Sequence, residues 1–124
     1  MSSIDEVDLD DTTETTVSTS RNGICSITPD GKTVHVSIDA PVATHLSFSF
    51  PAEKLQKYIT ELGRFIYGRQ KSVDMGSARF YTVHEGEYHY QAIGFTGPHF
   101  HIILSGNYVI ALARKVHGML MKLD

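Results

Sequence analysis

Short runs that alternate between hydrophobic and polar residues recur along the chain, and two of them pass directly into helical spacing. In residues 44–50 every second side chain is hydrophobic, which is the period of a half-buried strand. After Pro51 the hydrophobic residues recur every three or four positions as far as Ile66, which predicts an amphipathic helix. Residues 98–120 repeat the plan. We therefore predict a strand-to-helix unit that is used twice.

Two tight-turn signals place a hairpin ahead of each unit. Pro29-Asp30-Gly31 precedes a clear alternation over residues 32–39, and Glu85-Gly86 separates two further strand-like runs. Three strands then precede each helix, so we predict an α+β domain built from a duplicated βββα unit. Its antiparallel sheet carries both helices packed on one face. The two halves are placed at residues 23–70 and 77–122.

The first 22 residues differ in composition from the rest of the chain of 124. They hold six acidic residues against Arg21 alone and few large apolar residues, so we predict a disordered acidic arm at 1–22 and a single domain at 23–124. No apolar run is long enough to span a bilayer. A single cysteine, Cys25, cannot form an internal disulfide, and we expect its side chain to be buried. We expect a cytoplasmic protein with no membrane partner.

The histidines form the most informative pattern. We expect the turns to place Ser26 opposite His35 and His84 opposite Glu87. Six of the seven histidines then lie with Ser and Thr on the sheet face opposite the helices, whereas Tyr81 lies on the core side. Such an open face suits unpaired bases, which stack on Phe80 and on imidazole rings, while Lys and Arg nearby contact phosphates. The predicted nucleic-acid-binding residues are His35, His45, Arg64, Arg69, Lys71, Phe80, His89, Gln91, His99 and His101.

The order of sheet strands followed by a helix, used twice, is similar to that of the PUR and Whirly proteins, a class of single-strand binders. Those families place four strands before each helix where this sequence predicts three, and none of their sequence motifs is matched here. The resemblance implies an open sheet that binds single-stranded DNA or RNA. The leading hypothesis is therefore a non-enzymatic binding protein without a cofactor.

Three alternatives stay open from the sequence. The polar face is also what a solvated sheet presents without any ligand. His99 and His101, two residues apart on a strand, together with His89 are a possible zinc site that would activate a water for catalysis. The sheet face or the apolar second helix could instead join subunits of a homo-oligomer. Ser-His-Asp combinations can be drawn from the residues, but nothing in the sequence fixes their geometry.

Overall fold

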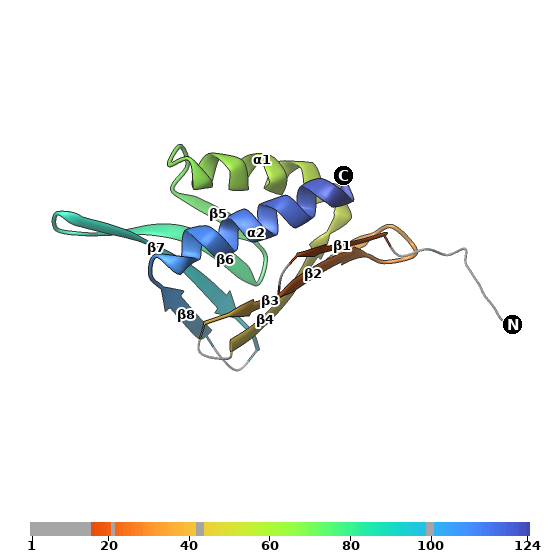
Figure 1. Ribbon diagram of the computed structural model, residues 1–124, viewed down its shortest axis with the longest axis horizontal. Coiled ribbons are helices and arrows are strands. Elements are labelled where there is room, and N and C mark those ends of the chain that lie inside the picture. Colours follow the sequence, from red (N-terminus) through yellow and green to blue (C-terminus); the bar gives the residue numbers. More distant parts are fainter. Residues whose placement is uncertain (1–15, 21, 42–43, 99–100) are drawn as a thin grey trace, which may run out of the picture.

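The protein folds into two four-stranded antiparallel sheets, each followed by a helix, so the α+β prediction is confirmed (Figure 1). The computed structural model describes residues 16–20, 22–41, 44–98 and 101–124. The first half contains β1 Thr16–Ser20, β2 Gly23–Ile27, β3 Thr33–Ala40, β4 Thr44–Pro51, a 3-10 turn at Ala52–Lys54 and α1 Leu55–Ile66. The second contains β5 Ser72–Met75, β6 Ala78–Glu85, β7 Tyr88–Thr96, β8 His101–Ser105 and α2 Tyr108–Leu123.

Each half begins with a strand that the sequence did not predict. β1 lies within the predicted disordered arm, of which residues 1–15 are outside the described residues, and β5 lies in the predicted link between the halves. Both strands are short and pair only with the next strand, β1 with β2 and β5 with β6. A four- or five-residue strand with few apolar residues carries little alternation, which is why the pattern predicted βββα where the structure has ββββα.

The first hairpin turn has the predicted register, with Ser26 opposite His35. Gly31 has a φ of 74°, which glycine adopts without steric cost. The Asp30 carboxylate accepts hydrogen bonds from the Thr28 hydroxyl at 2.5 Å and from the Lys32 N–H at 3.0 Å. These bonds, the Thr28 bond first, lower the pKa of Asp30 and hold the turn in place.

The second hairpin turn lies one residue later than predicted. Its central residues are Gly86 and Glu87, so Glu85 faces Tyr88 and His84 faces His89. The predicted pairing of His84 with Glu87 is therefore wrong by two positions. A shift of two leaves the relative faces of β6 and β7 unchanged, because side chains alternate with a period of two.

One hydrophobic core lies between the two sheets and the helices. The Phe48 and Phe95 rings, from β4 and β7, lie 5.9 Å apart and join the sheets. α2 contacts α1 and strands of both sheets, so its broad apolar surface is used within this chain. Cys25 is fully buried in this core, as predicted, and burial raises the pKa of its thiol to about 12. Among the described residues, no helix is long and apolar enough to cross a membrane.

Candidate functional site

The outer face of the first sheet, away from the helices, is polar as the sequence predicts. Val34, Val36 and Ile38 of β3 point into the core, so the residues between them point outward. His35 and His45 both lie on this outer face, opposite Ser49 and Asp39 of the neighbouring strand. Their exposure places them where a ligand can reach them.

Hydrogen bonds link most of these outward side chains. The Asp39 carboxylate lies 2.7 Å from His45 Nδ1, and the Ser37 hydroxyl lies 2.7 Å from His45 Nε2. Separately, His35 Nδ1 lies 2.6 Å from the Ser49 hydroxyl. A shallow hollow of about 240 Å³ adjoins the first group and is lined by Asn22, Gly23, Ile24, Ser37, Asp39 and His45. These contacts organise the face without any basic residue among those that line the hollow.

In the second sheet, the face that was predicted to be open points toward the helices instead. Phe80 is fully buried, and its ring lies 5.9 Å from that of Phe65 on α1, so the prediction that it stacks on bases is wrong. By strand alternation His89 and Gln91 share the Phe80 side, which faces the helices. The sequence assigned the wrong face to the core because Tyr81 of β6 and Tyr90 of β7 are nearly as hydrophobic as the residues on the core side. Alternation alone could not choose between the two faces.

This reversal gathers predicted residues at the end of α1 where the helix leads into β5. Lys71, His89 and Gln91 line one hollow of about 270 Å³, and Arg64 and Arg69 line a second hollow of about 440 Å³. The remaining lining residues are Thr60, Gly63, Phe65, Tyr67, Gly68, Gln70, Thr82 and His84. Both hollows are lined by residues of the segment where α1 leads into β5, and we call the two together the basic groove. Of the described residues that line it, three are Lys or Arg and none is acidic.

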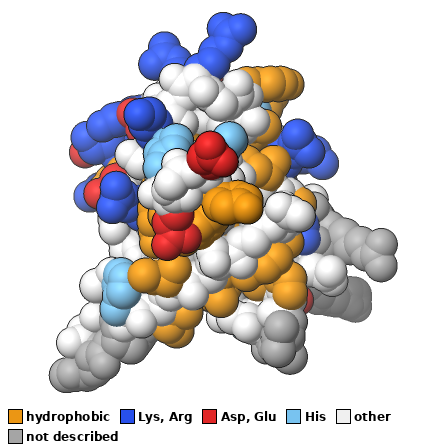
Figure 2. Space-filling model, turned by 90° about the vertical axis from the view of Figure 1, so that its left-hand side faces the viewer, with side chains coloured by type: hydrophobic (Ala, Val, Ile, Leu, Met, Phe, Trp, Pro, Cys, Tyr) orange, Lys and Arg blue, Asp and Glu red, His pale blue; other side chains and the backbone are white. Residues whose placement is uncertain are grey.

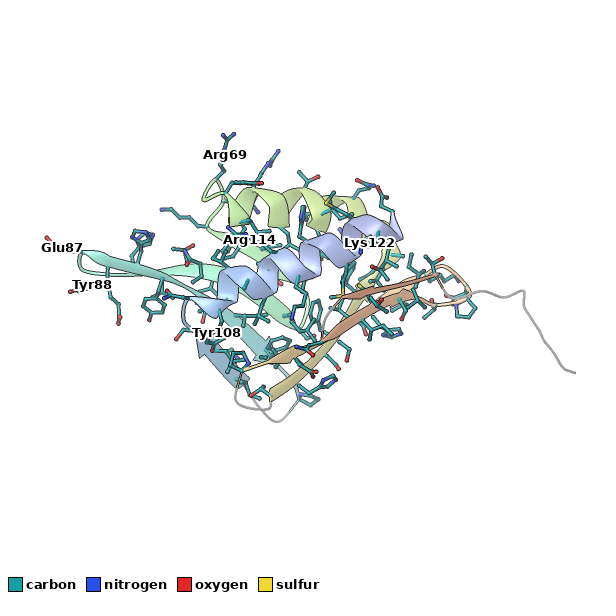
Figure 3. All side chains as sticks on the ribbon, viewed as in Figure 1. Arg69, Glu87, Tyr88, Tyr108, Arg114 and Lys122 are labelled. Carbon is teal, nitrogen blue, oxygen red and sulfur yellow. The ribbon has the colours of Figure 1, made fainter. Side chains whose placement is uncertain are left out.

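The basic groove lies at one end of the molecule. In Figure 3 the Arg69 side chain extends away from the body, above the β6–β7 hairpin. Figure 2 views this end and shows Lys and Arg side chains at the top and along the sides, with His and acidic side chains near the centre. Glu87 and Tyr88 are at the hairpin tip, where Tyr88 is 79% exposed. Within the groove, the His84 and His89 rings lie 5.9 Å apart on facing positions of β6 and β7.

The outer face of the second sheet forms a separate hollow of about 280 Å³ that sequence reasoning missed. Tyr81, which the alternation placed in the core, stands on this face with the Arg79 guanidinium 5.0 Å from its ring centre. His101 stands across the hollow, with Nδ1 2.9 Å from the Thr96 hydroxyl. Gly94 lies between them and leaves the floor open. A glycine inside a strand was the available signal, because it often marks a close approach.

The structure separates the residues of the predicted zinc site. His89 points to the helix side of the second sheet, whereas His101 lines the hollow on the outer face. The two cannot bind one ion, so this ligand set is wrong, and His99 lies outside the described residues. No group of three His, Cys, Asp or Glu in the described part of the chain is arranged to hold a metal.

Comparison with known proteins finds a distant structural likeness and no match in sequence. No family model matches the chain, and no curated protein sequence matches it. Among solved structures, the chain is similar to an SsgA-like sporulation-specific cell division protein from Thermobifida fusca YX-ER1. The sequence identity is 10% and the TM-score is 0.32, over 82% of this chain and 72% of that chain. We base no functional argument on a likeness of this strength.

Proposed function

We propose that this protein binds single-stranded nucleic acid in the basic groove. The observation that carries the proposal is that two hollows, both lined by the segment where α1 leads into β5, contain five residues predicted from sequence to bind nucleic acid: Arg64, Arg69, Lys71, His89 and Gln91. No carboxylate among the described groove residues competes with a phosphate for the three cations. The phosphate backbone supplies most of the affinity of a non-specific binder, so an acid-free cationic groove favours this ligand.

The groove also offers contacts for bases. The His84 and His89 rings are exposed flat surfaces beside Lys71, and unpaired bases stack on imidazole as well as on larger aromatic rings. Thr82 and Gln91 lie opposite each other on the same surface and supply hydrogen-bond donors and acceptors for base edges. Paired bases inside a duplex are not available for such stacking. The groove therefore favours a single strand over a duplex.

The strand count gives separate support at the level of topology. The PUR and Whirly single-strand binders have four strands followed by a helix, twice. The sequence predicted three strands before each helix, but the structure has four, as those families do. Topology alone does not fix function. The charge of the groove and the topology point to the same ligand class.

A salt series tests the proposal. We expect a fluorescently labelled single-stranded oligonucleotide to bind the full chain with an anisotropy increase that weakens as salt rises. Three phosphate contacts predict a slope of about −2 for log K against log salt, or about 20-fold weaker binding between 50 and 200 mM. An unlabelled duplex of the same sequence should compete poorly. Absence of binding at 50 mM salt, or a slope near zero, would remove the proposal.

A second candidate function, self-assembly, is favoured by one observation on β8. β8 is an edge strand of its sheet. Its adjacent residues Ile102 and Ile103 point to opposite faces and are 41% and 54% exposed. An uncovered apolar strand at a sheet edge is a template for pairing with another chain. We propose a second copy of this chain as its partner. Sedimentation over a range of protein concentrations should reveal a dimer or larger assembly, and a monomer at all concentrations would refute this candidate.

A further inference from the structure

Among the described residues, the first sheet contributes none to the basic groove, and three of its side chains are hydrogen-bonded in the sequence Asp–His–Ser that serine hydrolases use. Asp39 bonds to Nδ1 of His45, and Ser37 bonds to Nε2 of the same ring. We propose that Ser37 is a nucleophile that accepts an acyl group from small activated esters, and that water then hydrolyses the acyl-serine ester. This activity is independent of nucleic-acid binding, so either can fail without the other.

The strands hold this constellation in place. Ser37 and Asp39 are two residues apart on β3 and therefore share a face, while His45 on β4 lies directly opposite Asp39. Both contacts are 2.7 Å, within the range of good hydrogen bonds. A carboxylate can only accept, so in the neutral ring Nδ1 carries the proton and Nε2 presents its lone pair, with the Ser37 hydroxyl at 2.7 Å and the Ser47 hydroxyl at 3.4 Å. The Ser37 hydroxyl is the nearer of the two and is placed to donate to His45, which is the arrangement that activates a serine, while the Ser47 hydroxyl also lies 3.1 Å from Ser37 Oγ.

The same face contains a second serine–histidine pair that serves as a comparison. His35 and Ser49 also form a serine–histidine contact across β3 and β4, at 2.6 Å. This contact uses Nδ1, and within the described part of the chain no carboxylate is bonded to His35. The two serines therefore share a sheet face and a histidine partner, and differ in whether a carboxylate orients the imidazole. The proposal predicts reactivity at Ser37 and not at Ser49.

The hollow beside Ser37 indicates the kind of substrate. Ile24 of β2 lies directly opposite Ser37 and is 47% exposed, so it offers an apolar contact for a short acyl chain. Asn22 lines the same hollow and has a side-chain N–H that can donate to a developing oxyanion. His45 and Asp39 are 61% and 55% exposed, so water screens the charges that develop. Modest activation of this kind suits aryl esters with good leaving groups and not amides.

The chemistry uses groups already present. The Ser37 Oγ attacks the ester carbonyl carbon while its proton passes to His45 Nε2, and the carbonyl oxygen becomes an oxyanion. The intermediate collapses, the bond to the aryl oxygen breaks, and the leaving oxygen takes the proton from His45. An acyl ester on Ser37 remains. A water then attacks the acyl carbon as His45 accepts its proton, the carboxylic acid leaves, and the proton returns to Ser37.

Labelling with a fluorophosphonate probe, followed by peptide mass spectrometry of the full chain, tests the proposal. We expect the label on Ser37, lost in Ser37→Ala and His45→Ala and at least tenfold slower in Asp39→Asn. His35→Ala and Ser49→Ala should leave the labelling rate unchanged. Labelling of Ser47 or Ser49 that equals the labelling of Ser37, labelling that survives His45→Ala, or no labelling would each overturn the proposal. These side chains are outside the core, and a thermal melt of each variant verifies that it is folded.

Turnover of p-nitrophenyl acetate gives a second measurement. Surface lysines and histidines also react slowly with this ester, so the decisive quantity is the difference between wild type and Ser37→Ala. The proposal predicts an acetyl group on Ser37 detectable by mass in the wild type. A rate that is identical in wild type and Ser37→Ala, with no acetylated Ser37, would contradict it.

Discussion

Truncation of two adjacent aromatic residues on β6 tests which face of the second sheet is the core. Phe80 is fully buried against Phe65, whereas Tyr81 stands on the outer face beneath Arg79. Removing a buried phenyl ring loses its transfer free energy and leaves a cavity, so Phe80→Ala should cost about 3–5 kcal/mol. Tyr81→Ala should cost below about 1.5 kcal/mol, because the ring is only partly covered.

Urea denaturation followed by circular dichroism measures both costs. A domain of this size typically loses about 1–3 kcal/mol of stability per molar urea, so Phe80→Ala should lower the midpoint by about 2 M. Because small domains have only about 5–15 kcal/mol of stability, the variant should be close to unfolding. The reasoning would be refuted if Tyr81→Ala were the more destabilising of the two. That result would restore the face predicted from sequence, with Phe80 outward.

Three further outcomes are expected. Since the folded thiol of Cys25 ionises near pH 12 and an ordinary one near 9.0, the unfolding free energy of wild type should fall relative to Cys25→Ala as pH rises above 9, by up to about 1.4 kcal/mol per unit. A pH-independent difference in urea melts would contradict this. Deleting residues 1–15, which carry six carboxylates and no Lys or Arg, should tighten oligonucleotide binding at low salt by anisotropy, whereas unchanged affinity would exclude competition. Ile103→Lys should abolish any assembly seen by sedimentation, and an assembly that persists would place the contact away from β8.

The sequence predicted the two faces of β3 and β4 well because their alternation is clean. Val34, Val36 and Ile38 have polar residues between them, so one face is clearly hydrophobic and the other clearly polar. The register followed from Asp30-Gly31, whose turn chemistry fixes the pairing of β2 with β3. Those two signals place His35 and His45 on the outer face without any knowledge of tertiary structure.

The second sheet could not be oriented in the same way. Tyr81 and Val83 on one face of β6 are nearly as hydrophobic as Phe80 on the other, so burial depends on which side the helices cover. The direction of the chain after the α1 helix decides this, and no local pattern encodes it. As a result the sequence placed His89 and Gln91 on the face away from the helices, whereas the structure has them on the helix side with Phe80.

The Asp39–His45–Ser37 contacts were also beyond sequence reasoning. They depend on the β3–β4 register, in which Asp39 faces His45, and on side-chain rotamers that only a folded sheet defines. A shift of one residue would turn His45 toward the core and remove both bonds. The residue types were visible in the sequence, but the distances that give them chemical meaning were not.

A matched pair of charge variants is the sharpest test of whether the basic groove binds single-stranded nucleic acid. One variant carries Arg69→Ala and Lys71→Ala in the groove. The other carries Lys54→Ala and Lys122→Ala, exposed lysines outside its lining, and Lys122 lies at the C-terminal end of α2, away from Arg69 (Figure 3). Both lose two positive charges. Anisotropy at 50 mM salt should show about tenfold weaker oligonucleotide binding, and a salt slope shallower by about 1.4, for the groove variant alone. Equal weakening in both variants would contradict the groove as the binding site.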